Sequence, residues 1–149
     1  MFKEKIKVRL NFKAELFGPD GKLKEYRRKD NMVVTAGLTL IADLVSAQTK
    51  ALPSHAAIGT GTTAPTAGDT ALENELDRNA LTSATSSNNV ATYVADWAAG
   101  DGTGSITEAG LFNASSGGDM LSRVTFAVVN KGASDTLKCT WSHTYTYAA

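Results

Sequence analysis

Apolar and polar side chains alternate along residues 5–17, KIKVRLNFKAELF. A period of two places each set on its own face of a β-strand, so the segment is predicted to be a half-buried strand. The next residues, GPDGK at 18–22, have proline, aspartate and glycine in the order that tight turns favour, and they predict a return strand over residues 22–28. An N-terminal β-hairpin is therefore expected. Its inward-facing residues are Ile6, Val8, Leu10 and Phe12.

Basic residues are concentrated in this hairpin, although the whole chain has 15 Lys and Arg, 15 Asp and Glu, and a formal net charge of +0. Residues 1–30 hold ten basic and five acidic side chains, whereas residues 31–149 hold five basic and ten acidic ones. Two interpretations stay open: a surface for an acidic partner, or a solvated edge strand protected by lysines. The candidate partner-binding residues are Lys5, Lys7, Arg9, Lys13, Lys22, Lys24, Arg27 and Arg28.

The hydrophobic period changes after the hairpin and then returns to that of β-strands. In TAGLTLIADLVSA, apolar residues recur every three or four positions, which predicts one amphipathic helix over about residues 36–47 with Thr35 as a candidate N-cap. Residues 59–70 predict a long ordered surface loop, and residues 72–81 fit either a helical turn or a strand. From Val90 onward, four β-like segments are separated by turns rich in glycine, aspartate and serine.

These patterns predict a mainly β fold, an antiparallel β-sandwich or barrel with one amphipathic helix and an N-terminal β-hairpin. A chain of 149 residues suits a single domain, 1–149. Within it, residues 1–30 are the basic hairpin and residues 31–149 are the sandwich core with the helix.

Residues that carry catalysis or bind metals are scattered along the chain. His55 and His143 lie in different segments, and neither has ligand spacing to the single cysteine, Cys139. The sequence has no nucleophile elbow, no complete phosphate-binding motif and no calcium-binding loop. We therefore expect no enzymatic activity, no cofactor and no metal. We also expect no nucleic-acid or membrane partner, because aromatic base-stacking signatures and long apolar runs are missing.

Two further segments supply candidate residues. In ITEAGLF, residues 106–112, Gly110 allows a close approach, and Glu108 is expected to accept hydrogen bonds from the backbone or from Arg78 or Arg123, so both Glu108 and Gly110 are predicted to be structural. The last β segment places aromatic residues on one face, which is either core or interface. The candidates for self-association are Phe112, Trp141 and Tyr145.

Four stretches together resemble small structural proteins of tailed bacteriophages and the adaptor regions of some tail fibres. They read NMVVTAGLTLIADLV, AAIGTGTTAPTAGDTALENELDR, SITEAGLF and GGDMLSRVTFAVVNKGASDTLKCTW, and they span residues 31–142. The resemblance implies a virion structural protein that is assembled in the host cytoplasm. The basic hairpin, residues 1–30, lies outside it.

Two placements in the virion follow from this resemblance. A capsid decoration, or cement, protein would bind the major capsid protein, commonly as a trimer, and stabilise the capsid lattice. A tail, neck or fibre-adaptor component would instead bind tail or neck subunits. The chain has no fibre extension or collagen-like repeat, which favours decoration. Because aromatic and apolar side chains cluster in the last β segments and small virion proteins usually form closed symmetric assemblies, a homo-oligomer is expected, with a trimer as its form. A free enzyme or a host-directed binding module remains the third class.

Overall fold

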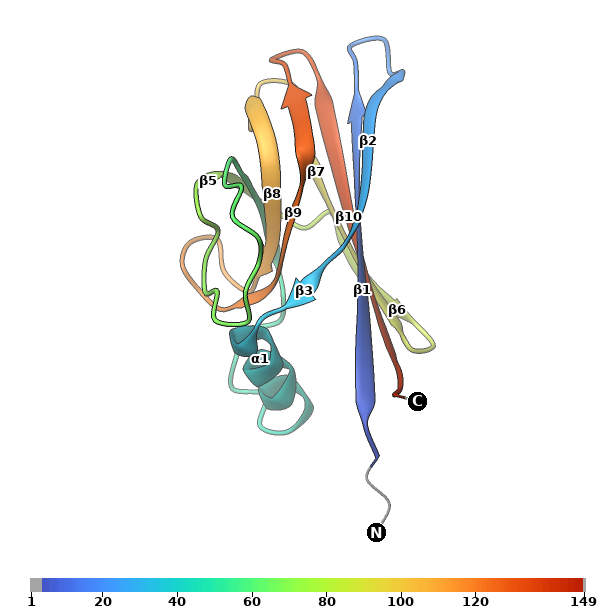
Figure 1. The fold of residues 1–149 in the computed structure, drawn as a ribbon, viewed down its shortest axis with the longest axis vertical. Coiled ribbons are helices and arrows are strands. Elements are labelled where there is room, and N and C mark those ends of the chain that lie inside the picture. Colours follow the sequence, from blue (N-terminus) through green and yellow to red (C-terminus); the bar gives the residue numbers. More distant parts are fainter. Residues whose placement is uncertain (1–3, 149) are drawn as a thin grey trace.

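Two antiparallel β-sheets pack face to face in the computed structural model, which describes residues 4–148 (Figure 1). The first sheet has the strand order β2-β1-β10-β7-β6, and the second has the order β3-β9-β8-β4-β5. This open sandwich confirms the mainly β prediction and decides against the closed barrel. The strands of the first sheet are β1 (Ile6–Phe17), β2 (Leu23–Asp30), β6 (Ser83–Ser87), β7 (Val90–Trp97) and β10 (Thr136–Tyr147). Those of the second are β3 (Met32–Val33), β4 (His55–Gly59), β5 (Glu75–Ala80), β8 (Gly104–Phe112) and β9 (Met120–Lys131).

The N-terminal hairpin is present as predicted. β1 and β2 pair from Asn11 opposite Asp30 to Phe17 opposite Leu23. On its other side β1 pairs with β10 over its whole length, so β1 is an interior strand and β2 is the edge of the sheet. β2 therefore matches the predicted solvated edge, and so does the part of β1 before Asn11, which extends beyond β2.

The helix α1 spans Thr35–Val45 and packs against β9. Its N-cap is Val34, without a side-chain hydrogen bond, so the expected capping role of Thr35 is wrong; the Thr35 N–H donates to the Ala67 carbonyl at 2.8 Å. The helix also ends two residues earlier than predicted: Ser46 is its C-cap, and the N–H groups of Ser46, Ala47 and Gln48 all donate to the Asp43 carbonyl, so the regular helical pattern stops there. Among the described residues, no helix has the length and apolar character needed to cross a membrane.

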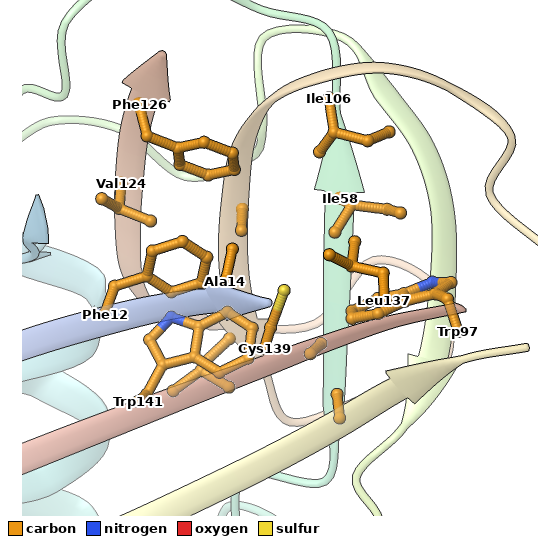
Figure 2. Close-up of a cluster of buried hydrophobic side chains, with 14 of the residues drawn as sticks. Phe12, Ala14, Ile58, Trp97, Ile106, Val124, Phe126, Leu137, Cys139 and Trp141 are labelled. Carbon is orange, nitrogen blue, oxygen red and sulfur yellow. The ribbon is translucent and has the colours of Figure 1, made fainter. Parts of the chain in front are cut away.

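The core lies between the two sheets. Phe12 of β1 packs between Phe126 of β9 and Trp141 of β10, with both ring centroids at 5.0 Å (Figure 2). Along the inward face of β10, Cys139 and Trp141 are fully buried, whereas Tyr147 is 83% exposed. The aromatic face of this strand is therefore core at one end and surface at the other.

The two layers differ in extent. Near the chain termini, β1 and β10 continue past the second sheet, and α1 lies beside this uncovered part (Figure 1). The inward face of the first sheet is thus covered by a sheet at one end and only flanked by a helix at the other.

Candidate functional site

Glu108 of β8 lies at the centre of a buried hydrogen-bonded network, and its own side chain is fully buried. Its Oε1 accepts hydrogen bonds from the backbone N–H groups of Gly61 at 3.0 Å and Asn74 at 2.7 Å. Its Oε2 accepts from the backbone N–H of Glu73 and from Nε of Arg123, each at 3.0 Å. Four donors around one carboxylate offset the free-energy cost of burying its charge.

Arg123 of β9 connects this carboxylate to the loop between β4 and β5. Its side chain is 3% exposed, and it donates to Oδ2 of Asp69 at 2.9 Å and to the Thr63 carbonyl at 3.0 Å. Burial alone raises the pKa of Asp69, but hydrogen bonds from Thr66 and Arg123 outweigh it and hold that pKa below its ordinary value. The predicted ordered loop, residues 59–70, is therefore held against β9 by the ion pair between Asp69 and Arg123.

Glycines make room for the network. A Cβ atom at Gly59 or at Gly61 would come within 2.6 Å of Oε1 of Glu108, closer than real side chains approach. The sequence pattern indicates only turn glycines at these two positions. At Gly110 the Ser122 carbonyl oxygen packs close to the backbone and would lie 3.1 Å from an added Cβ atom. The close approach predicted at Gly110 is therefore present.

The network supports the structural interpretation of Glu108. Of the two arginines considered as donors, the structure selects Arg123, while the Arg78 guanidinium lies 3.7 Å from the centre of the Phe112 ring and pairs with Glu75. The Glu108 carboxylate has no solvent contact and its oxygens are occupied by internal donors, so a solute outside the protein has no route to it.

Basic side chains gather on the outward face of the first sheet. Lys7, Arg9 and Lys13 alternate along β1 on the side opposite the core residues, and Arg28 of β2 lies directly across from Lys13. Lys138 of β10 is exposed on the same face, although the sequence analysis does not single it out. We call these five residues the outer basic face. The rest of β10 on this face is polar and consists of Thr136, Thr140, Ser142, Thr144 and Thr146. Three acidic residues, Glu15, Asp30 and Asp96, lie on the same face.

The other predicted partner-binding residues lie elsewhere. Nζ of Lys24 binds both carboxylate oxygens of Asp135 at 2.9 Å, and Arg27 donates to two β9 carbonyl oxygens at 3.0 and 2.6 Å. Arg27 thus joins the edge strand β2 to the second sheet, and Lys24 joins it to the turn between β9 and β10. Lys5 is exposed just before β1, and Lys22 is exposed just before β2. The eight predicted residues therefore do not share one surface.

Two of the three residues predicted for self-association are buried. Phe112 is 1% exposed and lies under the Arg78 guanidinium, and Trp141 is fully buried against Phe12. Their own chain covers both side chains, so placing them at a contact between copies is wrong, and core packing is the correct interpretation. Tyr145 is half-buried and reaches the surface.

Tyr145 lines an apolar groove between α1 and the uncovered inward face of β1, β7 and β10. The groove has a volume of about 510 Å³, and none of its lining residues is charged. Val45 and Ile6 at its rim are 82% and 76% exposed. The residues of the apolar groove are Ile6, Val8, Leu38, Ile41, Leu44, Val45, Pro53, Tyr93, Leu121 and Tyr145.

His143 precedes the groove residue Tyr145 on the inward face of β10 and is fully buried. The edge of its ring packs against Tyr93, with ring centroids at 5.3 Å. Neither ring nitrogen has a hydrogen-bond partner. Burial lowers the pKa of His143 to about 4, so the imidazole is neutral at pH 7.

Other reactive residue types are dispersed. Within residues 4–148, no three His, Cys, Asp or Glu side chains gather closely enough to hold a metal ion. His55 lies in the second sheet, with its Nδ1 at 2.9 Å from Oγ of Ser54. Burial raises the pKa of the Cys139 thiol, which keeps it protonated, and burial lowers the pKa of Lys131, whose Nζ donates to a backbone carbonyl.

The described residues thus present two surfaces, the outer basic face and the apolar groove, and one internal network centred on Glu108. The network fixes the loop between β4 and β5, whereas the two surfaces are open to partners. No family model matches the chain, no curated protein matches it in sequence, and no solved structure matches it.

Proposed function

We propose that this chain is a non-enzymatic structural protein of a tailed-bacteriophage virion, and that it is a capsid decoration protein. In this role it binds the lattice of the major capsid protein and stabilises it. The observation that carries the proposal is the outer basic face, on which five basic side chains outnumber the three acidic ones, Glu15, Asp30 and Asp96, that share this side of the sheet. The resemblance of residues 31–142 to phage structural proteins supports the virion assignment.

The outer basic face is suited to docking on an acidic surface because its spacing is fixed. β1 is hydrogen-bonded to β2 on one side and to β10 on the other, so its backbone is held over most of its length. Lys7 and Arg9 project from the first part of β1, which pairs with β10 but extends beyond β2, and both are exposed. Rigid placement of the backbone reduces the entropy lost on binding, and complementary charge accelerates association and suppresses wrong partners.

Stabilisation of a lattice needs only modest affinity at each contact. When identical contacts repeat by symmetry, binding at one site raises the effective concentration at the next, so weak interactions sum to a firm attachment. The Glu108 network contributes indirectly, because it keeps the loop between β4 and β5 in place while the outer basic face is bound to the lattice. A homo-oligomer, with a trimer as the expected form, would multiply the outer basic faces presented together.

Copy number in the particle separates decoration from the alternative placement. We expect purified virions to contain this chain in amounts comparable to the major capsid protein, because a decoration protein occupies every equivalent lattice position. Quantitative mass spectrometry or calibrated gel densitometry of purified particles measures this ratio. A few copies per particle would instead support a tail, neck or fibre-adaptor component, and absence from the particle would overturn both virion placements.

A further inference from the structure

We infer that the apolar groove is the surface through which copies of this chain associate, with the groove ends of sister chains meeting at a symmetry axis. The inference locates the homo-oligomer contact that the proposed function includes. It is tested with the protein alone in solution, so its failure is distinct from a failure of the virion assignment.

Much of the surface at the groove end of the molecule is apolar. Ile6 and Val45 are more than three-quarters exposed, and Leu38 is about half exposed. Tyr147 lies directly across from Ile6 and is 83% exposed. Single exposed apolar residues are ordinary in monomers, but contiguous ones beside a hollow are typical of an interface.

Charge also favours a second copy. In a contact between identical patches, side chains close to the symmetry axis lie near their own images, so charged groups there would face like charges. None of the groove residues is charged, which removes this repulsion. Elsewhere on the described surface, exposed apolar residues such as Leu23 and Tyr26 stand among the charged side chains of β2. The groove end of another copy offers a matching surface, apolar and uncharged.

The arrangement of the two layers supports the same contact. Over Phe12 and Trp141 the second sheet supplies the opposing layer, whereas Val8 and Tyr145 line the groove with α1 and, from outside the helix, Pro53 and Leu121. A sister chain would supply the missing layer over this part of the first sheet. It would also shield Tyr93, behind which the fully buried His143 packs.

The size of the patch sets the expected strength. The groove and the adjoining hollow formed with Asn89, Thr146 and Tyr147 involve about half of the roughly 20–30 residues that a standard interface uses on each side. Association in solution is therefore expected to be weak and dependent on concentration. On a lattice, where copies are already held close together, the same contact becomes effective.

Cross-linking through one introduced thiol detects such weak association. Cys139 is the single native cysteine and is fully buried, so in Val45→Cys the new thiol is the accessible one. The matched control is Leu23→Cys, an exposed apolar position at the turn end of the hairpin, whereas the groove lies at the end of β1 that contains Ile6. With a short bismaleimide, we expect about tenfold or more covalent dimer from Val45→Cys than from Leu23→Cys, increasing with protein concentration.

A second pair of measurements fixes the stoichiometry and the occupant. Sedimentation equilibrium of the wild type gives the number of copies, and Ile6→Glu/Val45→Glu is expected to sediment as a monomer with an unchanged far-UV spectrum, because both positions are exposed. Equal cross-linking at positions 23 and 45 would overturn the inference. A wild type that stays monomeric at all concentrations would also overturn it. If such a monomer bound an apolar dye and Ile6→Glu/Val45→Glu did not, the occupant of the groove would be a small hydrophobic ligand.

Discussion

Glu108→Gln is expected to lower the free energy of unfolding by about 3–5 kcal/mol, the range typical of breaking a buried ion pair from one side. The substitution removes the charge that faces Arg123, which is 3% exposed, and it turns an –NH₂ group toward backbone N–H donors such as that of Gly61 or Glu73. Chemical denaturation followed by circular dichroism measures the change. The loop between β4 and β5 should also become more susceptible to proteolysis, since three of the four bonds to Glu108 come from its backbone.

The control for this substitution is Glu15→Gln, which removes the same charge from a surface ion pair. Lys13 and Glu15 are 3.2 Å apart, with side chains 39% and 22% exposed, so we expect a loss below about 1 kcal/mol. Equal effects of the two substitutions would contradict the structural role of the network. A Glu108→Gln protein that folds and assembles normally but loses a measurable turnover would instead indicate a catalytic role.

Stability is expected to fall by about 3 kcal/mol as the pH drops from above 6.5 to below 4, through His143 alone. The imidazole has an ordinary pKa of 6.5 in the unfolded chain, whereas burial lowers the pKa of His143 to about 4 in the folded protein. Between these values the unfolded state binds the extra proton and the folded state does not, so acid favours unfolding. Above pH 6.5 the residue is neutral in both states and contributes no pH dependence.

The contribution of His143 is isolated by difference, because carboxylates such as Asp69 and Asp135 also lose stabilising interactions in acid. His143→Phe keeps an aromatic ring at a position where neither ring nitrogen has a partner, so it costs no hydrogen bond. Denaturation midpoints of the wild type and this variant should diverge as the pH falls below 6.5, and His55→Phe serves as the control. Parallel pH profiles for the wild type and His143→Phe would show that the folded protein protonates His143 freely.

Strand prediction succeeded where one face of a strand is buried. β1, β7 and β10 form within the predicted segments 5–17, 90–97 and 136–147, and β9 begins as predicted at Met120 but continues two residues past the predicted end, to Lys131. β6 (SATSS) has no apolar period because all five residues are exposed; it forms by pairing with β7. The ambiguous residues 72–81 become β5, since β4 offers a partner edge. Pairing with a distant strand leaves no mark on local periodicity, which is why these two strands could not be predicted.

The site was predictable only in part, for a related reason. A period of two shows which residues share a face, but not whether another layer covers that face. Phe112 and Trp141 therefore read as candidates for a surface, although the opposing sheet and the Arg78 side chain cover them. An acid isolated among apolar residues did predict hydrogen bonds to Glu108. Its backbone donors lie 34 to 47 positions away along the chain, and no sequence signal connects them to it.

The outer basic face is judged by binding to virus particles that lack this protein, measured over a range of salt concentrations. Two variants change the net charge equally: Lys7→Glu/Arg9→Glu on the outer basic face, and Lys22→Glu/Lys29→Glu elsewhere on the hairpin. Wild-type binding should weaken as salt rises, because exposed charges are screened over about 10 Å at 0.1 M ionic strength. We expect the first variant to stay folded and fail to bind, while the second binds nearly as the wild type does. Unchanged affinity and unchanged salt dependence of Lys7→Glu/Arg9→Glu would contradict docking through this face and leave it a solvated surface.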